Sequence, residues 1–115
     1  LPRAPRCSQI DDMRDIRLSN TFINQLNVLL AQGVASFGAR VVAQKRDLVF
    51  GLIHNFLAHH PAAKRPHPRL GLRVHAVRKT PFVLVYDFDD TELRVHFNFH
   101  KNASLEDIDP ASAEW

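Results

Sequence analysis

Residues 70–100 read LGLRVHAVRKTPFVLVYDFDDTELRVHFNFH, and apolar side chains recur at every second position through most of this stretch. A period of two is typical of strands, and here it predicts three of them, at residues 70–77, 82–86 and 93–100. The polar segments between them are short, so consecutive strands should pair antiparallel. The middle strand is apolar at every position, which indicates a central strand that is buried on both faces.

The same alternation predicts which side chains of the sheet face the core. We expect the apolar members of the outer strands to point inward, namely Leu70, Leu72, Val74, Ala76, Leu93, Val95, Phe97 and Phe99. The polar members should then lie on the opposite face or at the rim, and these include Arg73, His75, Arg94, His96, Asn98 and His100. Tyr86 ends the middle strand, where its ring fits a packing role.

The chain before this sheet begins with a short strand and a helix. Ile16 and Leu18 alternate with polar residues, which predicts a brief strand. Three residues then offer an N-cap, namely Ser19, Asn20 and Thr21, and apolar residues recur at helical spacing from Phe22 to Leu30.

A second helix follows a turn near Ala35 to Gly38. Its apolar stripe runs along one face from Val42 to Phe56, and Pro61 ends it. Three prolines in residues 61–68 then predict an extended, basic connector that leads into the sheet.

These elements predict an α+β fold with a short N-terminal strand, a helical hairpin and an antiparallel three-stranded meander, the helices packed on one face of the sheet. At 115 residues, of which 45% are hydrophobic, the chain suits one domain with a real core. We assign residues 13–104 to that domain. Residues 1–12 are expected to be a leader or extension outside the fold, and residues 105–115 an acidic C-terminal tail.

Cysteine and histidine usage argues against a metal or disulfide centre. Cys7 is the only cysteine, so an intrachain disulfide and a CxxC-type site are excluded. The histidines around the end of the second helix lack metal-ligand spacing, and we expect no metal and no cofactor. No apolar run is long enough to span a membrane, so we expect a cytoplasmic protein without a membrane partner.

Positive charge is concentrated in the middle of the chain. Residues 40–79 carry nine basic side chains against one acid, Asp47, whereas the residues from Leu105 onward carry acids and no basic residue. A basic segment of this kind suits a polyanion or an acidic partner segment, although charged residues also simply solvate helix faces.

One protein family shows the same features in the same order. Leu70-Gly-Leu-Arg73, a strand ending in Tyr86 and a strand ending in His100 follow a helical hairpin that is closed by a proline. This arrangement resembles the RelE/ParE superfamily of type II toxins, with the ParE-like branch favoured, and it covers about residues 15–108. One departure is the segment after His100, Lys101-Asn-Ala-Ser-Leu105, where ParE-like chains often carry an Arg-Asp pair.

The resemblance implies the toxin component of a type II toxin-antitoxin system. Such a toxin is neutralised by direct binding of a cognate antitoxin, ParD-like or RelB-like, in a hetero-oligomer. ParE-like members inhibit DNA gyrase, whereas RelE-like members cleave mRNA in the ribosomal A site. We favour gyrase inhibition and no enzymatic activity; the alternatives are a ribosome-dependent, metal-independent endoribonuclease and a standalone nucleic-acid-binding module.

A ribonuclease would need a general base, a general acid and cations near the phosphate. The candidates for these roles are Arg73, Arg94, His96, His100 and Tyr86. RelE-type toxins carry a denser basic set, so this one is incomplete, which favours the gyrase interpretation.

Binding residues follow from charge and from the expected groove. For the target we expect contacts from Lys64, Arg65, Arg69, Arg73, Arg78, Lys79, His100 and Lys101. For the antitoxin we expect a groove between the second helix and the sheet, with contacts from Leu52, Phe56, Arg73 and Arg94.

Overall fold

The computed structural model of the chain describes residues 14–68, 70–105 and 108–115. The expected leader and the predicted target contact Arg69 lie outside the described residues. The helices and strands are β1 (Asp15–Leu18), α2 (Asn20–Phe37), α3 (Ala39–Leu52), β2 (Arg73–Ala76), β3 (Phe82–Phe88) and β4 (Glu92–His100). A π-helical turn (Ile53–Leu57) extends α3, and single 3₁₀ turns lie at Pro61–Ala63 and Pro110–Ser112.

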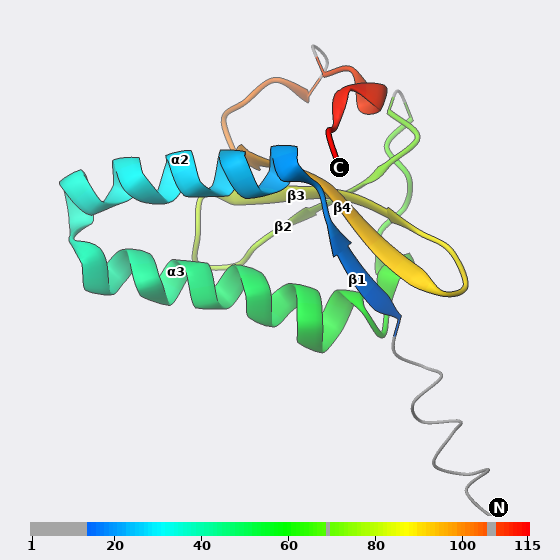
Figure 1. The fold of residues 1–115 in the computed structure, drawn as a ribbon, viewed down its shortest axis with the longest axis horizontal. Coiled ribbons are helices and arrows are strands. Elements are labelled where there is room, and N and C mark those ends of the chain that lie inside the picture. Colours follow the sequence, from blue (N-terminus) through cyan, green and yellow to red (C-terminus); the bar gives the residue numbers. More distant parts are fainter. Residues whose placement is uncertain (1–13, 69, 106–107) are drawn as a thin grey trace, which may run out of the picture.

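The four strands form one mixed sheet in the order β1-β4-β3-β2. The last three strands pair antiparallel, as predicted, while β1 lies parallel to β4 at the edge of the sheet. Helices α2 and α3 run side by side along one face of this sheet (Figure 1). The predicted α+β fold is therefore confirmed, and β3 is a central strand.

The helical hairpin depends on a cap, a turn and a close contact. Ser19 caps α2, because its Oγ accepts a hydrogen bond from the backbone N–H of Phe22 at 2.8 Å. Gly38 joins the helices with φ of 88°, a left-handed value that favours glycine. Gly33 lets the helices approach, because a Cβ there would lie 3.0 Å from a methyl group of Val42.

The main core lies between the hairpin and the sheet. Phe22 and Leu26 of α2 and Val49 of α3 are buried against it. The sheet contributes the remaining large buried side chains of this cluster, which include Phe82, Leu84, Tyr86, Leu93 and Val95. This apolar layer stabilises the α-on-β packing that the helical and strand periods predicted.

The predicted alternation along β4 is wrong beyond Val95. Val85 pairs with Phe97 while Tyr86 pairs with Val95, so a β-bulge leaves His96 without a cross-strand partner. Because of the extra residue, every later side chain of β4 points to the face opposite to the one predicted. Phe97 and Phe99 consequently pack on the face away from the helices, and Asn98, expected outside, is buried beneath α2 with 1% of its surface exposed.

The expected grouping of polar side chains on one outer face is also wrong. Arg73 and His75 pair across the sheet with Tyr86 and Leu84, which belong to the helix-side core, so both lie on the helix side at the edge strand β2. Arg94 lies on the other face, opposite Asp87. Alternation along the sequence does not predict this division of the polar side chains between the two faces, because the bulge and the strand register determine it.

The face away from the helices has a second apolar cluster. Val85 and Phe97 are buried there beneath Leu70 and Leu72 from the connector. Leu105, Ile108 and Ala113 of the C-terminal segment pack on the same cluster. This segment, orange to red in Figure 1, returns to the beginning of α2.

The C-terminal segment is hydrogen-bonded to the first turn of α2. The carbonyl of Glu114 accepts from the N–H groups of Asn20 at 2.6 Å and Thr21 at 3.2 Å. These are donors that a helix leaves unpaired at its N-terminus. The described residues of the predicted acidic tail therefore lie against the folded body.

Candidate functional site

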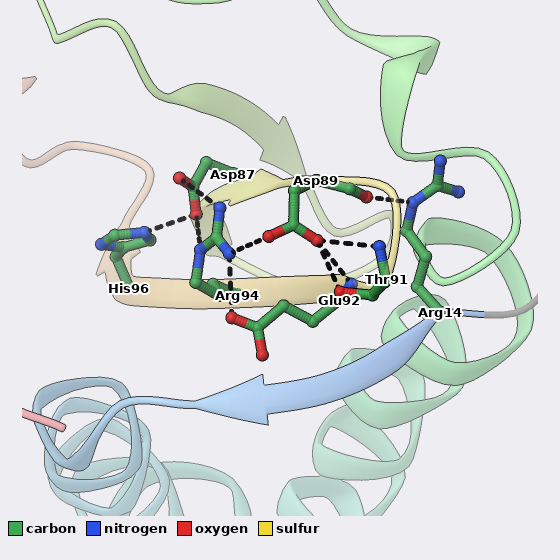
Figure 2. Close-up of polar contacts among 7 residues, drawn as sticks. All are labelled: Arg14, Asp87, Asp89, Thr91, Glu92, Arg94 and His96. Carbon is green, nitrogen blue, oxygen red and sulfur yellow. Dashed lines mark hydrogen bonds and ion pairs between the residues drawn. The ribbon is translucent and has the colours of Figure 1, made fainter.

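Arg94 is the centre of a network of ion pairs on the face away from the helices. Figure 2 shows its guanidinium among three carboxylates, all from the hairpin of β3 and β4. It bonds Asp87 through two nitrogens, at 2.9 and 3.1 Å, and reaches Asp89 and Glu92 at 2.8 Å each. The turn holds Asp89 in place, because its second carboxylate oxygen accepts three hydrogen bonds from Thr91 and Glu92.

This network stabilises the charged forms of Asp87, Asp89 and Arg94. Burial alone would raise the pKa of Asp87, but hydrogen bonds from Arg94 and His96 outweigh it and lower the pKa. Asp89 has its pKa lowered chiefly by the hydrogen bond from Arg94. Hydrogen bonds with Asp87, Glu92 and Asp89 raise the pKa of Arg94 above its ordinary value. Arg94 is therefore engaged with carboxylates and poorly placed to receive a phosphate.

His96 belongs to the same network. Its Nε2 lies 2.8 Å from a carboxylate oxygen of Asp87. The ring meets Trp115 edge-on, with 4.9 Å between centroids, and the guanidinium of Arg17 lies 5.0 Å from the centroid of that indole. Trp115, which the sequence left unassigned, thus covers His96.

Tyr86 is a core residue with a satisfied hydroxyl. Its side chain is fully buried, and the hydroxyl donates to the backbone carbonyl of Pro61 at 2.8 Å. Burial raises the pKa of Tyr86 to about 12, although the charge of Arg73 opposes this shift. A phenol in this setting serves packing and anchors the end of the second helix.

The five candidates for RNA cleavage do not converge on one point. Arg94 and His96 lie on one face, whereas Tyr86 is buried under the helices. His100 pairs with Phe82 and Arg73 pairs with Tyr86. Because Phe82 and Tyr86 are four residues apart on β3, His100 and Arg73 stand about 13 Å apart along the strand.

A different group of side chains gathers where β3 ends and the connector begins. We call it the aromatic–cation cleft: Arg14, Phe56, His59, His60, Pro61, Ala62 and Phe88 line it, and Arg73 borders it. Two guanidiniums lie over the ring of Phe88, that of Arg73 at 4.8 Å and that of Arg14 at 5.1 Å from its centroid. The phenyl ring thus holds two arginines close together.

Backbone carbonyls fix both arginines. Arg14 Nε donates to the carbonyl of Asp89 at 2.6 Å, as Figure 2 shows, and Arg73 donates to the carbonyl of Lys64. Sequence reasoning missed Arg14 and Phe88. An aromatic residue between the aspartates of a predicted polar turn was the available signal, since such turns are otherwise built from polar residues.

His75 extends the cleft along β2. Its ring centroid lies 5.8 Å from that of Phe56, and its Nδ1 is buried with no hydrogen-bond partner among the described residues. Burial, and then the charge of Lys64, lowers the pKa of His75. A histidine that is disposed to stay neutral therefore lies next to the cleft, through its contact with Phe56.

The other predicted target contacts lie at the opposite end of the sheet. Arg78 and Lys79 form the turn between β2 and β3, and the N–H of Lys101 donates to the carbonyl of Pro81 in that turn at 2.7 Å. β3 has seven residues, so this end and the aromatic–cation cleft are about 20 Å apart. Lys64, Arg65 and Arg73 belong to the cleft end.

The predicted antitoxin contacts are divided in a similar way. Leu52 and Phe56 are partly buried against the main core, and Phe56 lines the cleft that Arg73 borders. Arg94 lies on the other face of the sheet. One continuous groove does not contain all four residues.

Two features are absent from residues 14–68, 70–105 and 108–115. In these ranges no group of three or more His, Cys, Asp or Glu side chains is placed to hold a metal ion. Within them, too, no helix has the length and apolar character that crossing a membrane requires.

Known proteins resemble this chain in fold more than in sequence. The sequence matches no protein-family model and no curated protein. Its structure superposes on a chain of the solved structure described as "Chromosomal ParDE TA system from P. aeruginosa", with a TM-score of 0.66 and 16% sequence identity. The match covers 77% of this chain and 97% of that chain. The chain has a ParE-like fold.

Proposed function

We propose that this protein is the toxin component of a type II toxin-antitoxin system, neutralised by direct binding of a ParD-like antitoxin, and that it inhibits DNA gyrase. The ParE-like fold supports the first part of this proposal. The second part, inhibition of DNA gyrase, rests on the positions and pairing of the polar side chains.

The observation that carries the choice of target is the closed network around Arg94. Arg94 and His96 are already paired with carboxylates, and the hydroxyl of Tyr86 is bonded inside the core. Acid-base cleavage of RNA requires a base, an acid and a phosphate-binding cation within reach of one another. The dispersal of these groups favours a toxin that acts by binding.

The aromatic–cation cleft is the surface that we assign to the target. Aromatic rings and arginines are the residues that dominate protein interfaces energetically, and here both are fixed in position. The exposed cations Lys64 and Arg65 add positive charge beside the cleft. A negatively charged, partly apolar surface of gyrase would complement it.

The antitoxin is proposed to cover the same region. Leu52 and Phe56 offer apolar contacts, and Arg73 offers a cation for an acidic side chain. Occupation of this surface by the antitoxin would exclude the target, which is the simplest route to neutralisation.

The test begins with expression of the chain alone in bacteria. Growth should stop, and co-expression of the protein encoded beside it should restore growth. The purified chain at micromolar concentration should inhibit supercoiling by purified gyrase, and Arg73→Glu should abolish that inhibition. Arg46→Glu, a charge reversal on the exposed side of α3, is the matched control and should retain it.

The competing hypothesis, a ribosome-dependent ribonuclease, predicts the opposite result. If it is correct, transcripts from the arrested cells will show cuts in the ribosomal A site while gyrase remains fully active. Intact transcripts together with inhibited supercoiling support the proposal.

A further inference from the structure

The C-terminal strap, residues 108–115, covers part of the sheet face that lies away from the helices. Ile108 and Ala113 pack on the apolar cluster of Val85 and Phe97. The strap adds no strand to the sheet, and its regular structure is a single 3₁₀ turn. It ends beside the beginning of α2 (Figure 1). A segment of this kind opens more easily than the strands beneath it, so its individual contacts decide whether it stays closed.

Hydrogen bonds join the end of the strap to the first turn of α2. The carbonyl of Glu114 accepts from the backbone N–H groups of Asn20 and Thr21, and the N–H of Glu114 donates to Thr21 Oγ1 at 2.8 Å. The side-chain amide of Asn20 donates to the carbonyl of Trp115 at 3.0 Å. Water competes for the two side-chain bonds, which are exposed, so they position the strap but do not lock it.

The indole of Trp115 supplies the aromatic contact between the strap and the sheet. Its centroid lies 4.9 Å from that of His96 on β4, edge-on, and 5.0 Å from the guanidinium of Arg17 on β1. Beneath it, the side chain of His96 is only 13% exposed. Departure of the strap would therefore open the imidazole to water.

One nitrogen of this imidazole is satisfied and the other is not. Nε2 lies 2.8 Å from a carboxylate oxygen of Asp87, which also bonds Arg94, as Figure 2 shows. The carboxylate accepts, so Nε2 carries the proton of the neutral ring. Nδ1 is buried and has no hydrogen-bond partner among the described residues. A second proton would go to Nδ1 and would create a buried, charged N–H without an acceptor.

The charges around His96 do not offset this cost when the strap is closed. The sheet presents Asp87, Arg94 and Arg17, and the strap carries Asp109 and Glu114. Helix α2 has no ionisable side chain, and neither acid of the strap forms an ion pair with the ring. The contact with Asp87 lies within the sheet and persists when the strap leaves. Only the access of water to Nδ1 changes, so protonation favours the open form.

We infer that the C-terminal strap is an acid-released cover of the sheet. With His96 neutral, the indole of Trp115 packs on the imidazole and the strap is closed. A proton on Nδ1 detaches the indole, and the strap leaves both the first turn of α2 and the apolar cluster of Val85 and Phe97. The inference stands apart from the proposed function, because it requires neither toxicity nor gyrase.

Fluorescence tests the release directly, because Trp115 is the only tryptophan in the chain. Between pH 7.5 and 5.5 its emission should shift to longer wavelength as the indole enters water, while far-UV circular dichroism stays unchanged. Since release takes up one proton, the ratio of open to closed chains should rise by up to about tenfold for each pH unit. Binding of the dye ANS should increase in parallel, because the open form exposes apolar surface.

His96→Phe removes the proton site but keeps an aromatic ring beneath Trp115, and Asp87 remains paired with Arg94. Its emission should not shift down to pH 5.5. His54→Phe, on the exposed side of the second helix, is the matched control and should respond as the original chain does. The inference is overturned if the original chain shows no shift, or if His96→Phe shifts as much as the original.

Thr21→Val tests the strap without altering the imidazole. It removes the acceptor of the Glu114 N–H and leaves the cap of α2 at Ser19 intact. The ratio of open to closed chains at pH 6.5 should increase about threefold, so the fluorescence midpoint should move to higher pH. An unchanged midpoint would show that the strap is not held at α2 and would reject the inference.

Hydrogen exchange separates movement of the whole strap from movement of the indole alone. The amides of Asn20 and Thr21 donate to the carbonyl of Glu114, so they should lose protection over the same pH range as the fluorescence shift, after correction for intrinsic exchange. If these amides stay protected while the emission shifts, only the indole moves and release of the strap is excluded.

Discussion

Arg73 and Arg94 stand on strands of the same sheet and have opposite surroundings. Arg94 bonds three carboxylates at 2.8 to 3.1 Å. Arg73 stacks on Phe88 and donates to a backbone carbonyl, and it forms no ion pair with the residues that the structure describes. The sequence made both of them candidates for holding phosphate. The difference teaches that an arginine is available to a partner only where the fold leaves its charge uncompensated.

The largest expected effect is on stability at Arg94. Arg94→Met should lower the unfolding free energy by about 2 kcal/mol, because it leaves neighbouring carboxylates without their cation. Arg73→Met should change it by no more than about 0.5 kcal/mol. Urea denaturation at pH 7 measures both, and equal losses would remove the distinction between the two arginines.

The next largest effect is on gyrase inhibition, which should depend more on Arg73 than on Arg94. Arg73→Gln should weaken gyrase inhibition about tenfold, equivalent to about 1.4 kcal/mol, with little change in stability. Arg94→Lys keeps the charge but loses the bidentate contact with Asp87, so it should lower stability while inhibition by the folded fraction is retained. Inhibition curves at matched concentrations of folded protein compare the two variants.

Acid should weaken the network selectively. The pKa of Asp87 is lowered in the folded chain, so its contribution is complete above the ordinary aspartate value near pH 4 and is lost as pH falls through the lower folded value. Stability should therefore fall from pH 5 to pH 2, and less steeply in Asp87→Asn. If stability falls with pH as steeply in Asp87→Asn as in the original chain, the acid sensitivity arises from other residues.

The smallest effect should come from His75, beside Arg73. Its pKa is lowered, so below pH 6.5 the unfolded chain binds more protons than the folded one at this position. Stability should rise with pH in the window just below 6.5, and His75→Phe should flatten that rise. Denaturation between pH 5 and 7.5 tests it, with His54→Phe on the exposed side of the second helix as control.

Much of the fold was predictable because its signals are local. The strand at Ile16 and Leu18 occurs where alternation placed it, and the cap is Ser19, one of the three candidates. The turn is at Gly38, the last residue of the region predicted for it, because α2 continues to Phe37. The alternation on β4 failed after Val95 because a bulge depends on pairing with β3. Asn98, assigned to the outside, was misplaced for the same reason.

The candidate sites were predicted less completely. Arg73, Lys64 and Phe56 were selected from charge and periodicity, and they lie in or beside the aromatic–cation cleft. Arg14 and Phe88 were missed, because only the packing of β1 beside the β3–β4 turn brings them together. Arg94 was overrated, since its pairing with Asp87 is a cross-strand contact that composition does not reveal.

The sequence by itself determined the order of elements, the helical hairpin and the antiparallel meander. These depend on caps, glycines and periods of two and 3.6, which act within a few residues along the chain. Tertiary structure alone decided which arginine is compensated and which face each β4 side chain takes. Those outcomes depend on distances between residues far apart in the chain, and a single bulge shifts them without changing the local pattern.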